Sequence, residues 1–420
     1  MLGRLPRPVS TPSHEEDDQM SRPCSILIVV DTLTDNGSLR WVHKLAALWL
    51  EASWAVVYLS LKRGVDGRPP LMPPAGASLT YGDTAERRFR RGLPGAVLRA
   101  LRAARAADAV MVISEVELSL PFAYVIARLV RRPFVVYVQN VPERSHEIHL
   151  NRWRSPLWRH CLTHADAVLC VAPAGAESAA RMGVDRSKLT VASTGIDVDM
   201  VRRLGSPDGP GRPQHTSAPL VACGELYHRK GYDLLLRALA DVRRMGHPVR
   251  LVLIGEGQEG PTLKRLAQDL GLSEAVTFTG HLGNPLPEIA QSAAFVHCAR
   301  VEGVPQVLLE AIALGVPTIA TDCDGGGPRM ILGGGAYGRL VEPESVPALV
   351  EAILAHLNDP SQLTQQAAEG EIHLREHFSP ARTAEIVLDV LARVDESRPR
   401  RRGALSRWRE RRLSAAVPTP

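Results

Sequence analysis

Two glutamates eight positions apart, Glu302 and Glu310, are the most informative residues of this sequence. Gly303 and Pro305 follow the first, and an apolar run around the second continues to Pro317, which is the pattern of a loop that enters a helix. The first turn of a helix has unpaired N–H groups and the positive end of the helix dipole, so it suits a phosphate. A carboxylate before that turn and another two turns into the helix could bind hydroxyl groups on either side of a diphosphate. The spacing therefore indicates a site for a sugar nucleotide.

Four other loops contain weaker candidates. Residues 224–231 follow an apolar run and include Lys230, a point charge that could neutralise a diphosphate. Residues 253–257 match only half of a dinucleotide fingerprint, so an NAD site is weakly indicated. Residues 322–324 fit an Asp-x-Asp manganese pattern that recurs by chance, and we interpret them as loop carboxylates. The glycines of residues 325–329 would let the backbone approach a ligand. The alternative for each is a solvent-exposed turn.

Length and composition narrow the class of protein. A chain of 420 residues with 45% hydrophobic and 23% charged residues is typical of a soluble protein of two domains. The net charge is +5, and the eight arginines and one glutamate of residues 397–420 contribute +7 of it, so the rest of the chain carries about −2. A basic tail on a slightly acidic body argues against a nucleic-acid-binding core.

Cysteine usage and the chain's N-terminal region indicate the compartment. The six cysteines show no zinc spacing, which favours a reducing, cytoplasmic setting. No apolar run is long enough for a transmembrane helix, and four acidic residues within residues 15–18 replace the apolar stretch of a signal peptide. Basic and aromatic residues mix in residues 87–91 and 144–158. These segments are most simply solvated helix faces, and the alternative is peripheral contact with the inner face of a membrane.

Short apolar runs alternate with helical patterns, which predicts parallel βαβ units in two successive halves. We expect strands at residues 25–31, 54–61, 109–114, 134–139, 167–171, 188–192, 220–223, 249–254, 276–279, 294–297 and 318–321. We expect helices at residues 39–51, 122–130, 233–244, 346–357 and 380–393. The predicted organisation is a disordered extension (1–22), a first domain (23–204), a linker (205–218), a second domain (219–378), a C-terminal helix that packs back on the first domain (379–396) and a disordered basic tail (397–420).

The motifs of the second half together resemble the GT-B-fold glycosyltransferases of family 4. Order and spacing match over about residues 220–345, from the loop at 224–231 through 253–257, 276–280 and 302–317 to 337–341. The first half is similar in outline. The resemblance implies two Rossmann-like doubly wound domains that face a central cleft. It also implies a retaining, metal-independent transferase that uses a nucleotide-sugar, most commonly a UDP-sugar, as its substrate and needs no cofactor.

The resemblance also assigns roles to individual residues. Glu302 would face the donor sugar, Lys230 would contact the diphosphate, and Gln139 would stand where the family has a histidine. Asn36 and Gly37 would belong to the acceptor loop. The donor-binding residues that the resemblance implies are Glu310, which would hold the ribose hydroxyls, and Arg229, Gly303, Val304, Pro305, Gln306, Val307, Gly255, Gly280, His281 and Arg329.

Three positions depart from the family pattern, and they keep other functions open. Glu225 stands where the family has arginine, Gln139 where it has histidine, and Met330 where it often has glutamate. Arg229 or Arg329 could replace the missing diphosphate cation, and Gln139 can still hydrogen-bond a sugar. The main alternative is a non-catalytic sugar-nucleotide-binding partner of an active transferase, and another is a phosphorylase or synthase with a phosphorylated acceptor. The acceptor itself could be a glycan, a lipid-linked intermediate or a small molecule.

Overall fold

The computed structural model describes residues 23–34, 36–62, 70–82, 89–205, 218–396, 405 and 408–409. The predicted extension at residues 1–22 and most of the predicted linker and basic tail therefore lie outside the described residues. Residues 87–88 of the first basic segment lie outside them as well. In the part of the chain that the structure covers, no helix has both the length and the apolar character needed to cross a membrane.

The first domain is a seven-stranded parallel sheet in the order β3-β2-β1-β4-β5-β6-β7. Its strands are β1 Ser25–Val30, β2 Ala55–Ser60, β3 Ser78–Tyr81, β4 Ala109–Val112, β5 Phe134–Val138, β6 Ala167–Cys170 and β7 Leu189–Val191. Its helices are α2 Gly37–Glu51, α3 Phe89–Ala106, α4 Ser119–Val130, α5 Pro142–His149, α6 Ser155–Thr163, α7 Pro173–Arg181 and the short η1 Arg186–Lys188. The strand order reverses between β1 and β4, the point at which doubly wound sheets open a crevice for ligands.

The second domain repeats this plan with six parallel strands in the order β10-β9-β8-β11-β12-β13. Its strands are β8 Leu220–Cys223, β9 Leu251–Ile254, β10 Val276–Gly280, β11 Ala294–His297, β12 Thr318–Thr321 and β13 Arg339–Val341. The helices of the second half are α8 Val198–Gly205, η2 His228–Lys230, α9 Tyr232–Arg244, α10 Gly260–Asp269, α11 Leu286–Ala290, α12 Gln306–Ala313, α13 Gly327–Ile331, η3 Gly333–Gly335, α14 Val346–Asn358, α15 Ser361–His377 and α16 Pro380–Glu396.

Both sheets are covered by helices on both faces, which explains why their central strands are continuous apolar runs rather than alternating patterns. All six residues of β1 are buried, as are all four of β11. Each sheet therefore has a hydrophobic core on each side, and the two domains together have four such clusters. The predicted α/β architecture of two doubly wound domains is confirmed.

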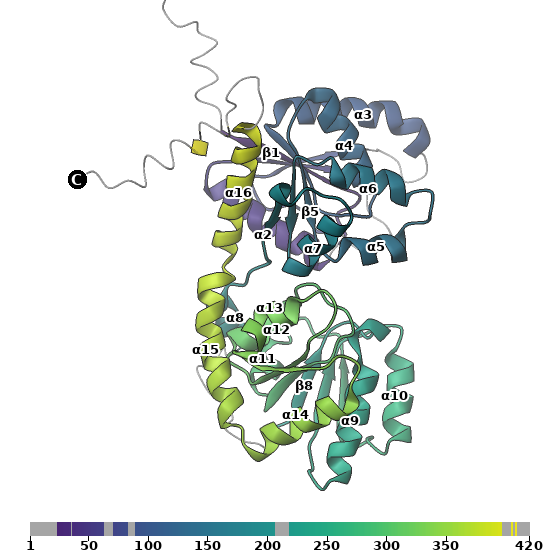
Figure 1. Ribbon diagram of the computed structural model, residues 1–420, viewed down its shortest axis with the longest axis vertical. Helices are drawn as coiled ribbons and strands as arrows, with labels where there is room; N and C mark the ends of the chain where they lie inside the picture. The colour runs from purple at the N-terminus through teal and green to yellow at the C-terminus, as the bar shows by residue number, and fades with distance from the viewer. Residues whose placement is uncertain are drawn as a thin grey trace, which may run out of the picture.

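The last two helices connect the domains. Figure 1 shows α15 and α16 following one another along one side of the molecule, α15 beside the second domain and α16 beside the first. Val387 and Leu391 of α16 are buried in the core of the first domain, and Trp49 Nε1 of α2 donates to the Ala384 carbonyl at 3.3 Å. Where the helices meet, the N–H of Ile196 donates to the Phe378 carbonyl at 2.7 Å.

The structure also contains features that the sequence did not predict. Helix α8 lies at the end of residues 23–204, the predicted first domain, where the sequence analysis predicted no helix. Val198 and Val201 are nevertheless buried in a core cluster of the second domain together with residues of α11 and α12. Helix α8 has one strongly apolar face, and α11 and α12 offer the apolar surface that covers it. The predicted boundary is therefore too late. Strands β3 and β13 at the sheet edges were also missed, because β3 has no buried residue and β13 has one, so neither forms an apolar run.

Candidate functional site

The loop that carries Glu302 is fixed by the glycine-rich segment after β12. The N–H of Glu302 donates to the Asp324 carbonyl at 2.9 Å. A Cβ atom placed on Gly327 would lie 1.4 Å from the Gly303 carbonyl oxygen, and one on Gly325 would lie 2.1 Å from that of Glu302. These glycines therefore allow close packing against the Glu302 backbone, rather than the approach to a ligand that the sequence predicted.

Glu302 lies within a cluster of basic side chains. Lys230 Nζ forms a short ion pair with Glu302 Oε2, and Arg229 Nη1 lies 3.0 Å from the same oxygen. The side chains of Lys230 and Glu302 are only 11% and 15% exposed. Both cations belong to η2, which ends at Gly231 with φ 68°, and a side chain there would collide with the Cys298 carbonyl. The close approach of these backbones brings Lys230 to Glu302.

The charges around Glu302 keep it ionised. Burial acts to raise the pKa of its carboxyl group, but the neighbouring positive charges outweigh burial and lower the pKa. His297 Nε2 also lies 3.9 Å from Glu302 Oε2. Because burial lowers the pKa of His297 to about 4, this imidazole is neutral at pH 7, and we attribute the lowered pKa of Glu302 to Lys230 and Arg229.

This arrangement predicts a pH-dependent contribution of Glu302 to stability. A carboxyl group whose pKa is lowered by folding stabilises the folded state above its ordinary value near 4.5, and that stabilisation is lost as the pH falls through the folded value. Glu302→Gln should therefore have a lower melting temperature than the parent protein at pH 7. The difference should shrink as the pH is lowered below 4.5. Melting curves of both proteins from pH 7 to pH 3 test this, and a constant difference would contradict it.

His297, the last residue of β11, is a site residue that sequence reasoning missed. It is buried, and among the described residues neither of its ring nitrogens has a hydrogen-bond partner. An unpaired buried polar atom costs about 1–3 kcal/mol of stability. The available signal was a histidine at the end of an otherwise apolar strand, five residues before Glu302. A lone histidine is weak evidence until its surroundings are known.

Helix α12 supplies the predicted anion-binding end and the second glutamate. Pro305 is its N-cap, in extended backbone, so the first N–H groups of the helix, on Gln306 and Val307, have no partner within the helix. Burial raises the pKa of the Glu310 carboxyl, while Lys44 and Arg40 of α2 act to lower it. In the part of the chain that the structure describes, this carboxylate makes no hydrogen bond or ion pair. Glu310 is thus available for ligand hydroxyl groups.

Three glycines lie side by side where β8, β9 and β10 end. Gly255 N–H donates to the Gly280 carbonyl at 2.9 Å, and a Cβ atom on Gly255 would lie 2.0 Å from the Gly224 carbonyl oxygen. The next residue, His281, donates its N–H to Glu256 Oε1 at 3.3 Å. The predicted donor-binding residues Gly255, Gly280 and His281 therefore lie together at the carboxyl ends of these strands, in the same domain as Lys230.

Gln139 lies at the contact between the two domains. A Cβ atom on Gly303 would lie 3.0 Å from the Gln139 carbonyl oxygen, so the loop that follows β5 meets the loop that follows β11. The buried Glu115 accepts from Gln139 N at 3.3 Å and from Ser145 Oγ at 2.9 Å, which holds the Gln139 loop in place. The side-chain Nε2 of Gln139 is buried and has no partner within the described ranges. The fold therefore joins Gln139 to the Glu302 loop, although 163 positions separate them.

Other predicted residues have different partners. Arg329 of α13 is exposed and forms a short ion pair with Asp322, not with the Glu302 cluster. Asn36 is the N-cap of α2, with its side chain accepting from Leu39 N at 2.9 Å, and Gly37 is the first residue of that helix. No group of three or more His, Cys, Asp or Glu side chains that could hold a metal ion is found among the described residues.

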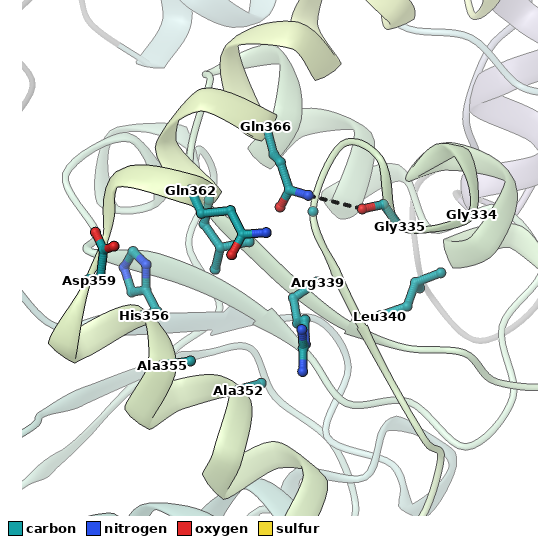
Figure 2. A pocket seen from close by; sticks show the side chains of 12 residues that line it. Gly334, Gly335, Arg339, Leu340, Ala352, Ala355, His356, Asp359, Gln362 and Gln366 are labelled. Carbon is teal, nitrogen blue, oxygen red and sulfur yellow. Dashed lines mark hydrogen bonds between the residues drawn. The ribbon is translucent and has the colours of Figure 1, made fainter.

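The second domain also contains a separate cavity of about 260 Å³. It is bounded by η3, β13, α14 and α15, and Figure 2 shows Gln362, Gln366 and His356 around it. Gln366 Nε2 donates to the Gly335 carbonyl at 3.1 Å across one wall. None of the candidate site residues described above lines this cavity, so it is distinct from the candidate site.

Two family models match the chain, one in each half. The model described as Glycosyl transferases group 1 matches residues 212–372, and the model described as Glycosyltransferase Family 4 matches residues 36–200. The first match contains Lys230, Glu302 and Glu310, and the second contains Gln139. The candidate site therefore lies within the matched segments.

Similar proteins include a GDP-mannose-dependent monoacylated alpha-(1-6)-phosphatidylinositol monomannoside mannosyltransferase of Corynebacterium glutamicum, 32% identical over 52% of this chain and 55% of that protein. Another is the lipopolysaccharide core biosynthesis glycosyltransferase LpsE of Rhizobium meliloti, 30% identical over 54% and 65%. The chain thus matches about half to two thirds of the length of these relatives. Among solved structures, HepE of Anabaena in complex with UDP has a TM-score of 0.71 at 17% identity and covers 88% of this chain and 99% of its own.

Proposed function

Because the chain belongs to family 4 of the GT-B-fold glycosyltransferases, we propose that it transfers a sugar from a nucleotide-sugar donor with retention of configuration. The observation that carries this proposal is the cluster of Lys230, Arg229 and Glu302 next to the N-terminus of α12. The cluster combines two cations and free helix N–H groups, which suit a diphosphate, with a carboxylate, which suits sugar hydroxyls.

In the proposed reaction the charge that needs stabilisation develops on the leaving diphosphate. Lys230 and Arg229 would neutralise it together with the N–H groups of Gln306 and Val307, so that no metal ion is required. Glu302 would orient the donor sugar, and Glu310 would hold the ribose. The leaving phosphate would take the acceptor proton, which explains why the proposal needs no dedicated base.

The nucleotide base and the acceptor are further parts of the proposal. The sequence favoured UDP, and HepE of Anabaena was solved with UDP. The mannosyltransferase of Corynebacterium glutamicum depends on GDP-mannose and is more similar in sequence, so we place GDP-mannose beside UDP-sugars as a candidate donor. The names of the relatives point to acceptors in glycolipids or lipopolysaccharide. The exposed Trp153, with Arg152 over its ring at 4.7 Å, would suit contact with the membrane surface that holds such an acceptor.

One observation keeps the non-catalytic alternative in view. Glu225, which replaces a family arginine, lies 3.5 Å from Arg229 and so competes for a cation that the diphosphate needs. Because both side chains are about half or more exposed, water screens this pair, and we expect it to yield to a diphosphate. A protein that binds donors but never turns them over would support the alternative.

Thermal stabilisation by nucleotide-sugars tests donor binding. We expect one base among UDP-, GDP-, ADP- and dTDP-sugars to raise the melting temperature selectively, with and without manganese. A ligand at a hundredfold its Kd adds about 2.7 kcal/mol of stability, which is easily measured. No shift with any donor would contradict the proposed function. A shift that requires manganese would contradict metal independence, and transfer or hydrolysis of the stabilising donor then separates the enzyme from the non-catalytic alternative.

A further inference from the structure

The proposed mechanism leaves His297 unexplained. Its side chain is 4% exposed, yet neither ring nitrogen has a hydrogen-bond partner among the residues that the structure describes. Nearly all buried polar groups in proteins are paired, and each exception needs a physical reason. The other residues of β11, Ala294–His297, are Ala, Phe and Val, so the strand itself gives no reason for a polar side chain at its end.

The surroundings of His297 suggest that reason. The charged groups that face it are Lys230 and Arg229 from η2 and Glu302 from the loop after β11. His297 Nε2 lies 3.9 Å from Glu302 Oε2, just beyond hydrogen-bond distance. That oxygen is already bound by both cations. His297 is therefore next to a carboxylate whose current partners are the two residues that a diphosphate would attract.

Donor binding changes this balance of charges. The phosphate oxygens of a nucleoside diphosphate compete with Glu302 for the N–H groups of Lys230 and Arg229. A mostly buried carboxylate that loses these partners needs another hydrogen-bond donor. Within the described residues, the imidazole of His297 is the basic side chain that remains within 4 Å of it.

We propose that His297 is a positioning residue: when a diphosphate draws Lys230 and Arg229 toward itself, His297 Nε2–H donates to Glu302 and holds that carboxylate toward the donor sugar. This inference rests on the proposed function, because it requires the diphosphate at Lys230. Without a diphosphate Glu302 is bound by the two cations, which accounts for the lack of partners for the His297 nitrogens among the described residues.

The protonation of His297 gives a direct readout. In the free protein, burial lowers its pKa to about 4, and the positive charge of Lys230 acts in the same direction. A bound diphosphate adds negative charge and draws the cations away, and both changes favour the imidazolium form. We expect the pKa of His297 to rise by at least one unit when the diphosphate binds. An unchanged pKa of His297 in the presence of the diphosphate would mean that the cations stay on Glu302, which the proposed hydrogen bond from His297 does not allow.

The experiment is an NMR titration of the full chain with ring-¹⁵N histidine, from pH 4 to pH 8, alone and saturated with UDP or with GDP. His297→Gln identifies the signal by its loss. Binding is followed separately by the melting temperature. A diphosphate that stabilises the protein and raises the pKa of His297 is the expected result. Stabilisation without any change in that titration overturns the inference alone, whereas no stabilisation by any of UDP, GDP, ADP and dTDP overturns the proposed function and the inference with it.

A variant pair tests the same inference without assigned spectra. His297→Leu removes two unpaired polar atoms, so the free protein should melt at the same temperature or higher. Glu302 is proposed to face the sugar, so the variant should bind UDP-glucose or GDP-mannose more weakly while it binds UDP or GDP as before. The ratio of the affinity for the nucleotide-sugar to the affinity for the bare diphosphate should fall about tenfold. The control is His356→Leu in α14, another buried histidine, whose Nε2–H donates to the Ala293 carbonyl at 3.0 Å and which lines the cavity of Figure 2. It should lower stability and leave that affinity ratio unchanged. An unchanged ratio in His297→Leu, or an equal change in both variants, overturns the inference.

Discussion

Lys230→Met should reduce sugar transfer or donor hydrolysis by about 10²–10³-fold, because it removes a cation from the developing diphosphate charge while keeping an aliphatic stem of similar length. Lys230 is the close partner of Glu302 and is only 11% exposed, so water cannot replace its charge efficiently. The expected loss is in kcat and in kcat/KM together, since the cation is needed most when the bond to the diphosphate breaks. Steady-state kinetics with the donor that stabilises the protein measures this loss.

Two comparisons make the Lys230 result specific. Lys264→Met removes an exposed lysine on α10 whose ammonium lies over the Phe278 ring, and it should leave turnover unchanged. Lys230→Met also leaves Glu302 with Arg229 as its remaining close cation, so some stability should be lost. Circular dichroism at the assay temperature shows whether the variant is folded. A folded Lys230→Met protein with at least half of the parent activity would exclude the proposed role.

Glu310→Ala should weaken nucleotide binding by about 10- to 100-fold, the effect of losing hydrogen bonds to a charged group. Glu310 lies on α12 and is largely buried without a hydrogen bond or ion pair from the described residues, as expected of a carboxylate that awaits ligand hydroxyls. The corresponding 2′,3′-dideoxy nucleotide should bind the variant and the parent protein with similar affinity. Isothermal titration with UDP or GDP and its dideoxy form measures both effects, and unchanged affinity for the ribonucleotide would refute the ribose assignment.

Stability and pH separate this role from a structural one. Because burial raises the pKa of Glu310, folding disfavours its ionised form at neutral pH. Glu310 therefore destabilises the folded state at neutral pH. This destabilisation is absent when the pH is below the ordinary carboxyl pKa near 4.5, and it grows as the pH rises through the pKa of Glu310 in the folded protein. Glu310→Gln should therefore melt at a higher temperature than the parent at pH 7 and at an equal temperature at low pH. A variant that melts lower than the parent at pH 7 would indicate a structural role instead.

Much of the fold could be predicted because its signals are local. The apolar runs of β1 and β11 and the helical pattern of α9 are properties of consecutive residues, and the structure places these elements within one or two residues of the predicted positions. Helix α8 was not predicted, and its residues 198–204 fell within the predicted first domain, for the opposite reason. Its apolar face could be read from the sequence, but the surface that covers it could not.

In the candidate site, too, the sequence indicates individual residues, whereas the fold decides which of them are in contact. The sequence indicated Glu302, Glu310 and Lys230 by type and spacing, and the family resemblance pointed to Gln139. The fold brings Lys230 and Gln139 to the Glu302 loop. The sequence did not indicate that Lys230 pairs with Glu302 before any ligand binds. Arg329 shows the limit more clearly, because it was considered as a diphosphate cation and instead pairs with Asp322, seven residues away.

The sequence by itself determined the class of fold, the order of its main elements and the candidate residues for a sugar-nucleotide site, because periodicity and motif spacing are encoded along the chain. Only the tertiary structure decided which of those groups meet. Lys230 and Glu302 are 72 positions apart and become neighbours because β8 and β11 are adjacent in the sheet, so that the loops at their carboxyl ends converge. The same adjacency places His297 beside them, and its position in the sequence does not reveal the role that we propose for this buried histidine.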